Sequence, residues 1–145
     1  NKGAKMKNRT FAIIKPDAVK NGNTGKIYDK IIQSGFEIIS AKLLKMDIRQ
    51  AEGFYSVHKE RPFFNDLTEF MTSGPCMVLA LKKEDAVKSW RDTIGATNPD
   101  EAADGTIRKE FATSVQENAV HGSDSDENAE KEIAFFFTDS ELLTN

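Results

Sequence analysis

The chain has 145 residues, of which 39% are hydrophobic and 30% charged, and its formal net charge is -3. This length and composition predict one globular domain with a hydrophobic core, and they exclude a disordered or fibrous chain. The negative charge argues against a broad nucleic-acid-binding surface, and the single cysteine, Cys76, excludes an intrachain disulfide and a cysteine-based zinc site. Because the longest apolar runs are too short to cross a bilayer, we expect a cytoplasmic protein without a membrane partner. Residues 1–8 are interpreted as a tag remnant and flexible N-terminus, and residues 9–143 as the domain.

The first expected element is a strand over Thr10–Ile14, a continuous apolar run that is typical of a central strand buried on both faces. Pro16 ends this strand, because proline has no N–H to donate to a neighbouring strand. A helix is expected over Asn23–Gly35, with the glycine closing it. A second strand is expected over Phe36–Met46.

Asp47 is expected to cap a helix that runs through His58. Another helix is expected to begin at Arg61, where the following proline suits a first turn. A third buried strand is expected over Cys76–Leu81, and a helix follows it over Lys83–Gly95.

Residues 96–120 are less regular, and so long an irregular stretch inside a compact domain is usually functional. Asp124 and Glu127 have the spacing of a capping pair for a last short helix. Ala134–Thr138 is expected to be a short fourth strand. This order of elements favours an α+β sandwich with a split β-α-β core, in which helices pack on a four-stranded antiparallel sheet.

Polar and aromatic side chains at strand ends and in loops each have an ordinary structural explanation. Lys15 can simply end a strand, and Arg91 can complement the dipole at a helix C-terminus. Arg108 is consistent with surface charge, Thr97 with a turn, and Phe63 with a core position. Taken singly, none of these residues predicts a function.

His121 is one of only two histidines, and it lies in an acidic, serine-rich stretch. It is either incidental to a solvated loop or a nucleophile that nearby hydroxyls and carboxylates orient. The other histidine, His58, is more consistent with a surface or interface position than with a second catalytic group. Most of the acidic residues after His121 are consistent with a solvated face, and Ser123 and Glu132 are kept as candidate supports of the imidazole.

Six short motifs occur together in this chain, and their order is more informative than any one of them. They are IIKPDAV (Ile13–Val19), RPFF (Arg61–Phe64), TSGP (Thr72–Pro75), GATNP (Gly95–Pro99), GTIR (Gly105–Arg108) and NAVHGSDS (Asn118–Ser125). On these motifs the chain resembles the nucleoside diphosphate kinase family, from about Arg9 to Leu143. It ends soon after FFFTDSELL, as the shorter bacterial members do.

The resemblance implies a ferredoxin-like α+β fold and a ping-pong exchange of a γ-phosphate between nucleoside triphosphates and diphosphates. His121 would be the phosphate acceptor, with Ser123 and Glu132 supporting its ring. Tyr55 would lie beside the site. The residues that would contact the nucleotide are Lys15, Phe63, Arg91, Thr97, Arg108 and Asn118. The family also forms tetramers and hexamers, and the short C-terminus favours a tetramer.

The chemistry of these residue types suits such a reaction. A neutral imidazole, with an ordinary pKa of about 6.5, can carry a phosphoryl group at neutral pH. Arg91 and Arg108 offer forked donors that match phosphate oxygens, and Lys15 with Asn118 can bind ribose hydroxyls and bridging oxygens. Mg²⁺ is expected as the cofactor, held mainly by nucleotide phosphates rather than by protein ligands. Phe63 offers a flat apolar face to any base, which predicts broad base tolerance.

Two other classes of function remain open at this stage. A non-catalytic interaction module on the same fold could retain the pocket, although here the set of motif residues is complete. A single-stranded nucleic-acid binder would need exposed aromatic residues on strands among basic residues. The expected partners are therefore nucleotides and further copies of the chain, and no sequence-specific nucleic acid.

Overall fold

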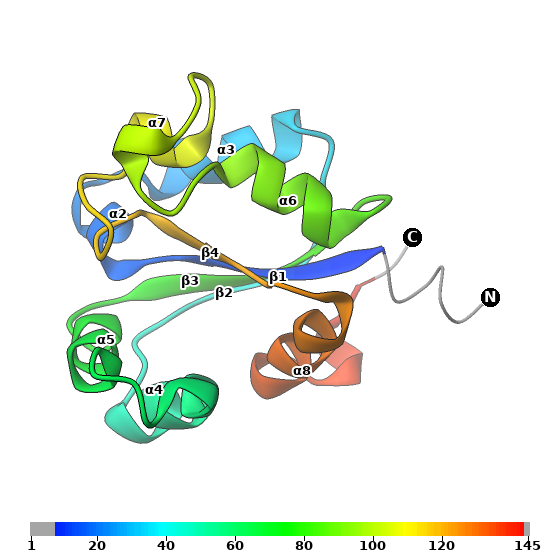
Figure 1. Cartoon of the computed structure of the whole chain (residues 1–145). Coiled ribbons are helices and arrows are strands. Elements are labelled where there is room, and N and C mark those ends of the chain that lie inside the picture. Colours follow the sequence, from blue (N-terminus) through cyan, green and yellow to red (C-terminus); the bar gives the residue numbers. More distant parts are fainter. Residues whose placement is uncertain (1–7, 144–145) are drawn as a thin grey trace.

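The computed structural model describes residues 8–143, which build a four-stranded antiparallel sheet between two layers of helices (Figure 1). The strand order is β2-β3-β1-β4, and the bounds are β1 Arg9–Ile14, β2 Glu37–Leu44, β3 Cys76–Lys82 and β4 Val120–Gly122. The predicted ferredoxin-like α+β sandwich is confirmed, as are the first three expected strands. Residues 1–7, which include most of the expected tag remnant, lie outside the described residues.

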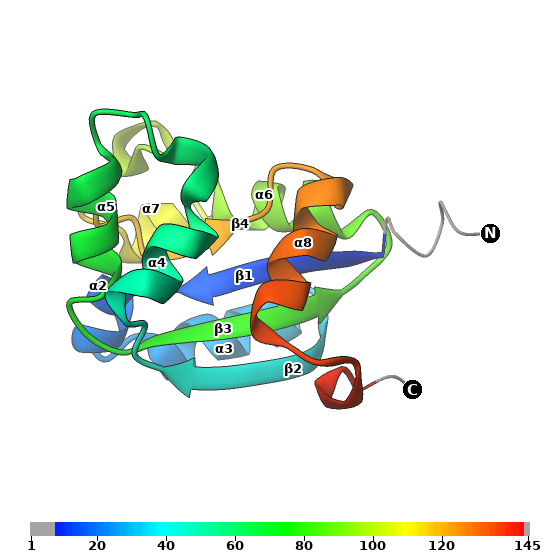
Figure 2. The same cartoon turned by 90° about the horizontal axis from the view of Figure 1, so that it is seen from below.

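Helices cover both faces of the sheet (Figures 1 and 2). On one face lie α2 (Pro16–Lys20), α3 (Thr24–Gln33), α6 (Ala86–Ile94) and α7 (Ile107–Phe111). On the other face lie α4 (Ile48–Phe54), α5 (Phe64–Met71) and α8 (Asp126–Phe136). Across residues 8–143 no helix combines the length and hydropathy needed to span a bilayer. Because both faces are covered, residues 8–143 present no open aromatic sheet to a single-stranded nucleic acid.

Strand β1 belongs to two hydrophobic cores at once. Phe11 and Ile13 pack in the core beneath α4, α5 and α8, whereas Ala12 and Ile14 pack in the core beneath α3, α6 and α7. All four side chains are fully buried, and burying a large apolar side chain stabilises a fold by about 1.5–3 kcal/mol. The continuous apolar run therefore has the predicted cause, which is burial on both faces.

The expected fourth strand over Ala134–Thr138 is wrong. Helix α8 continues through most of this run, because its buried residues Ala129, Ile133 and Phe136 recur at helical spacing and pack on the sheet. The fourth strand is instead Val120–Gly122, which is too short to produce an alternating pattern in the sequence.

The helix expected from Asp47 is capped as predicted but ends earlier. The Gln50 N–H donates to Asp47 Oδ1 at 2.8 Å, and the Asp47 N–H donates to Gln50 Oε1 at 3.0 Å. Helix α4 ends at Phe54, and the chain then tightens into a 3-10 turn over Ser56–His58. This turn brings the buried Tyr55 into the core.

The predicted capping pair of Asp124 and Glu127 is also wrong. Ser125 caps α8, because its Oγ accepts the Asn128 N–H at 3.1 Å. Asp124 accepts instead from the Asn128 side chain, at 2.6 Å. Asp124 and Ser125 are adjacent in the chain. A carboxylate and a hydroxyl are about equally common as helix caps, so the sequence alone does not choose between them.

Other differences are small but bear on the site. Helix α5 begins at Phe64, three residues later than expected, and the short helix α2 was not expected. Pro16 ends β1 and also occupies the first position of α2, where its missing N–H costs nothing. The irregular region contains a 3-10 turn over Pro99–Glu101 and the short helix α7.

Gly95 ends α6 with a φ of 86°, and a Cβ placed there would lie 2.6 Å from Thr106 Oγ1. We expect Gly95→Ala to lower the free energy of unfolding by about 1–3 kcal/mol, through backbone strain and overpacking. Urea denaturation measures the change. Gly25→Ala is the matched control, because a Cβ on Gly25 meets no atom within 4 Å and the residue lies in a helix. Equal stability of the two variants would contradict the expectation.

Candidate active site

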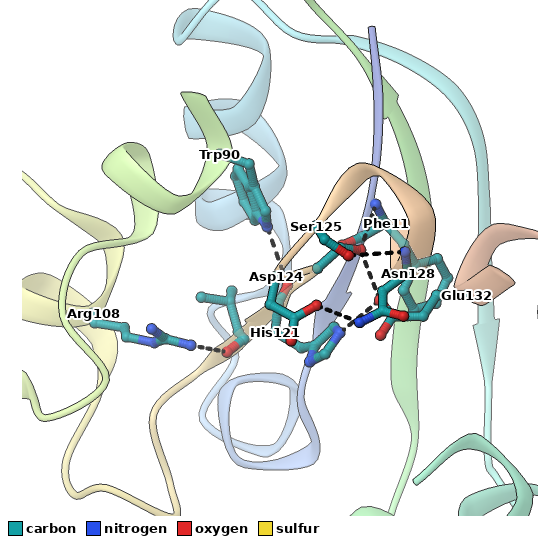
Figure 3. Close-up of polar contacts among 10 residues, drawn as sticks. Phe11, Trp90, Arg108, His121, Asp124, Ser125, Asn128 and Glu132 are labelled. Carbon is teal, nitrogen blue, oxygen red and sulfur yellow. Dashed lines mark hydrogen bonds and ion pairs between the residues drawn. The ribbon is translucent and has the colours of Figure 1, made fainter. Parts of the chain in front are cut away.

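The backbone of His121 is held by the neighbouring strand β1 and by Trp90 of α6. His121 lies in the middle of β4, opposite Ile13 of β1. Its carbonyl accepts a hydrogen bond from Trp90 Nε1 at 3.1 Å (Figure 3). The next residue must be small, because a Cβ on Gly122 would lie 2.8 Å from Trp90 Cδ1. The rigid indole therefore positions the peptide that carries the imidazole.

The imidazole is held through one of its two nitrogens. Its Nε2 lies 3.1 Å from Glu132 Oε1 (Figure 3). The same oxygen accepts the Ser123 hydroxyl at 2.7 Å. Ser123 is fully buried and its Oγ also accepts the Phe11 N–H at 3.3 Å. An ionised carboxylate can only accept, so this pair favours the tautomer with the proton on Nε2. The lone pair of Nδ1 is then available for attack on an electrophile.

Aromatic rings surround His121 on the core side. The ring centroids of Phe11, Phe54 and Tyr55 lie 6.1, 5.6 and 6.4 Å from the imidazole, and each ring meets it edge to face. Burial, and then the charge of Glu132, raise the pKa of the Tyr55 hydroxyl above its ordinary value. Tyr55 therefore stays protonated and can serve as a neutral donor.

His121 opens into a cavity of about 370 Å³. Tyr55, His58 and Glu132 also line this cavity. The His58 ring lies 6.4 Å from that of Tyr55 and 5.4 Å from that of Phe63. His58 thus bridges the imidazole cavity and the exposed phenylalanine at the start of α5.

A second cavity, of about 550 Å³, adjoins the first at Gly122 and is lined by arginine. Arg91, Thr97 and Arg108 contribute to it, together with the carboxylates of Asp92 and Glu101. Within residues 8–143, neither arginine forms an ion pair with a carboxylate. Two cations that share a cavity in this way favour an anionic ligand.

Arg108 is anchored by backbone carbonyls and remains charged. It is 9% exposed, and its two terminal nitrogens donate to the carbonyls of Gly95 at 3.0 Å and Val120 at 2.9 Å. Burial, and then the nearby charge of Arg91, lower the pKa of Arg108 to about 10. The guanidinium is therefore cationic at neutral pH and is held next to β4.

Lys15, Asn118 and Thr97 form a chain of hydrogen bonds. Lys15 Nζ donates to Asn118 Oδ1 at 2.8 Å and to the carbonyl of Gln116 at 3.1 Å, and Asn118 Nδ2 donates to the Thr97 carbonyl at 3.3 Å. Lys15 is 7% exposed. Burial lowers its pKa to about 8, with Asp17 opposing the shift and Arg108 adding to it.

Phe63 lies apart from both cavities and is 47% exposed. Across from α5, Val115 is 55% exposed, and the neighbouring Gln116 side chain donates to the Asp66 carbonyl at 3.5 Å. The irregular segment and the start of α5 therefore approach each other with an apolar side chain on each. Val115 was not predicted, and its only sequence signal is an apolar residue in a polar stretch.

The structure brings the predicted residues together in three groups. One group is His121 with Tyr55, Ser123 and Glu132, and a second is Arg91, Thr97 and Arg108. Lys15 with Asn118 is the third group, linked to the second by the Thr97 carbonyl.

Sequence reasoning missed three residues that organise these groups: Asp17, Trp90 and Ala119. Asp17 Oδ2 accepts the Ala119 N–H at 3.0 Å, and Ala119 has a φ of 73°. An aspartate directly after a strand-ending proline is a weak signal, and nothing in the sequence pairs Trp90 with His121.

Comparisons with known proteins agree with this geometry. The family model described as nucleoside diphosphate kinase matches residues 8–142. The nucleoside diphosphate kinase of Geotalea uraniireducens is 58% identical over 135 residues, which cover 93% of this chain and 98% of that protein. That of Salinibacter ruber is 51% identical and covers 94% and 96% of the two chains.

Solved structures give the same result. The Aquifex aeolicus nucleoside diphosphate kinase superposes with a TM-score of 0.92 at 46% identity, covering 94% of this chain and 99% of that one. The Halobacterium salinarum nucleoside diphosphate kinase, solved in complex with CDP, has a TM-score of 0.90 at 37% identity and covers 94% and 91%. The chain therefore belongs to the nucleoside diphosphate kinase family, and the expectation of a phosphotransferase enzyme is confirmed.

The contact between Glu132 and His121 predicts a loss of phosphotransfer when the carboxylate is removed. We expect Glu132→Ala to lower kcat by about 10–100-fold, the loss typical when a partner that orients an imidazole is removed from a metal site. Glu132→Gln should lose less, since an amide oxygen still accepts from Nε2. Phosphotransfer from ATP to a nucleoside diphosphate measures both.

Glu127→Gln is the matched control for these variants. Glu127 lies on the same helix but is exposed and pairs only weakly with Lys131, at 3.6 Å. A kcat for Glu132→Ala equal to that of the control would show that Glu132 has no role in the reaction.

Proposed function

We propose that the chain transfers the γ-phosphate of a nucleoside triphosphate to a nucleoside diphosphate through a phosphohistidine at His121. The observation that carries this proposal is the pairing of His121 Nε2 with Glu132, which leaves the Nδ1 lone pair unused. His121 lines one cavity, Arg91 and Arg108 line another, and Gly122 lines both. A single nucleophile with alternating donor and acceptor gives ping-pong kinetics.

In the first half-reaction, the Nδ1 lone pair attacks the terminal phosphorus of the triphosphate. A bond forms between nitrogen and phosphorus, the bond from phosphorus to the bridging oxygen breaks, and the diphosphate leaves with that electron pair. The second half-reaction reverses these events with another diphosphate. In the tautomer with the proton on Nε2, where it can be donated to Glu132, the Nδ1 lone pair is free and the ring can attack without first losing a proton.

The charged residues stabilise the phosphate oxygens during this transfer. Such a transition state spreads negative charge over three equatorial oxygens, so catalysis depends on positioning and electrostatics. Arg91 and Arg108 supply cations from the second cavity, and Thr97 adds a hydroxyl. Lys15 and Asn118 would contact the ribose hydroxyls and the oxygens that bridge the phosphates.

We propose that Mg²⁺ reaches the site as part of the nucleotide complex. Residues 8–143 contain no group of three or more His, Cys, Asp or Glu side chains placed to hold a metal. Mg²⁺ is commonly bound by substrate phosphates and water with few protein ligands, which suits this arrangement. When bound, the ion supplies further neutralisation of phosphate charge.

The base would stack on Phe63, with Val115 on its other face. Both side chains are about half exposed. Stacking on an aromatic ring contributes about 1–3 kcal/mol per base and does not read base edges. Broad base tolerance follows from this arrangement.

We further propose that the chain acts in the cytoplasm as a homo-oligomer, with a tetramer favoured over a hexamer. In support, β2 is an edge strand of the sheet and its Leu43 is 62% exposed, which suits a contact between copies. Light scattering of the purified protein measures the assembly directly.

The phosphohistidine is tested by intact mass after brief exposure to ATP and Mg²⁺. We expect one phosphoryl group per chain, which acid removes and alkali leaves in place, and which a nucleoside diphosphate discharges. His121→Ala should lose both the adduct and turnover. An acid-stable, alkali-labile phosphate would place the group on a serine such as Ser123 or Ser125 and overturn the proposal.

The buried Lys15 predicts a pH dependence of substrate capture. Its lowered pKa of about 8 means that the free enzyme loses this cation as the pH rises above 8. We therefore expect kcat/KM for the diphosphate to fall through pH 8, because kcat/KM reports ionisations of the free enzyme. In Lys15→Met this decline should be absent and kcat/KM at pH 7 already low. An unchanged decline in the variant would assign it to another group.

A further inference from the structure

The backbone before His121 adopts a strained turn. The Val120 N–H donates to the Asn118 carbonyl at 2.8 Å, which closes a three-residue γ-turn around Ala119. Ala119 has a φ of 73°, a conformation that an alanine side chain disfavours. The turn separates two functional residues, because Asn118 precedes Ala119 and His121 follows two residues later.

The backbone N–H and the backbone carbonyl of Ala119 are hydrogen-bonded to the residues on either side of Pro16. Asp17 Oδ2 accepts the Ala119 N–H at 3.0 Å, and the Lys15 N–H donates to the Ala119 carbonyl at 2.8 Å. The Ala119 N–H cannot be satisfied inside the γ-turn, so a side-chain acceptor is needed in the buried interior. Asp17 supplies that acceptor.

Apart from this bond, the Asp17 carboxylate has few hydrogen-bond partners. Asp17 is 5% exposed, and its other oxygen, Oδ1, has no hydrogen-bond partner among residues 8–143. Burial raises the pKa of its carboxyl, against the opposing charge of Lys15. A buried carboxylate with so few partners costs stability, so packing does not explain its presence.

We propose that Asp17 is a positioning residue, which holds the γ-turn at Ala119 and so places Asn118 and His121 on the nucleotide site. This inference rests on the proposed phosphohistidine function. Asp17 touches neither His121 nor the arginine-lined cavity, and it acts through the Ala119 peptide.

The charge of Asp17 has a second effect, on Lys15. The charged groups that act on Lys15 are Asp17, which favours its protonated form, and Arg108, which opposes it. Those that act on Asp17 are Lys15 and Glu117. Replacing the carboxylate with a neutral group should therefore lower the pH at which Lys15 loses its proton.

Three substitutions separate these roles: Asp17→Ala, Asp17→Asn and Ala119→Gly. Asp17→Ala removes the acceptor, and we expect the rate of His121 phosphorylation by ATP to fall about 100-fold, the size of effect typical of a small misplacement of a reacting group. Asp17→Asn keeps an acceptor oxygen and should retain most of the rate at pH 7. Its decline in kcat/KM with rising pH should begin at lower pH than in the wild type.

The decisive variant combines Asp17→Ala with Ala119→Gly. Glycine adopts positive φ without strain. If Asp17 acts by holding the turn, the double variant should therefore be phosphorylated about tenfold faster than Asp17→Ala alone. No restoration, or a rate for Asp17→Ala equal to that of the wild type, would overturn the proposal. If Asp17→Ala does not fold, as judged by circular dichroism, Asp17→Asn decides instead: it keeps the acceptor oxygen, so a rate of His121 phosphorylation at pH 7 about 100-fold below that of the wild type overturns the proposal.

Two controls complete the experiment. Asp85→Gly relieves the second positive φ found at a non-glycine residue within residues 8–143, 52° at the start of α6, and it should not restore the Asp17→Ala rate. The wild type tests the underlying function separately. An acid-labile phosphate on the wild type with equal labelling of Asp17→Ala contradicts only the role of Asp17, whereas no label on the wild type contradicts the proposed function itself.

Discussion

The pairing of β1 with β4 is the contact on which the rest of the site depends. It matches Ala12 with Gly122, Ile13 with His121 and Ile14 with Val120. Because β1 is buried on both faces, it cannot shift without disturbing two cores. Lys15 and Asp17 follow the C-terminal end of β1, and its partner strand β4 carries the imidazole of His121. A histidine in a strand of only three residues is thereby held as firmly as a core residue.

The site concentrates positive charge at a cost in stability. Lys15 and Arg108 are both buried, and burial lowers the pKa of each, so their charged forms are less favourable in the folded protein than in water. Within residues 8–143 neither forms an ion pair with a carboxylate within 4.0 Å. An anionic nucleotide would supply the missing counter-charge. Strain and desolvation stored in this way are typical of sites that gain their stabilisation on binding.

The sequence predicted the fold where one physical cause dominated a segment. The apolar run of β1 and the Asp47 cap of α4 are examples. The strand predicted over Ala134–Thr138 was wrong because a short apolar segment suits a helix as well as a strand. Strand β4 was missed because it is too short to show a periodic pattern. Most candidate site residues came from ordered motifs, whereas Asp17 contacts Ala119 across 102 positions, so this contact could not be inferred from the local sequence.

The contact between the indole of Trp90 and the carbonyl of His121 also has an optical consequence. The chain contains one tryptophan, so its indole fluorescence arises from a single, fully buried place. At that place the indole N–H donates a hydrogen bond to the backbone carbonyl of His121. Emission intensity and wavelength depend on the local field and on hydrogen bonding of the ring N–H. Any change of charge on the neighbouring imidazole is therefore carried to an intrinsic reporter, without a label and without a background from other tryptophans.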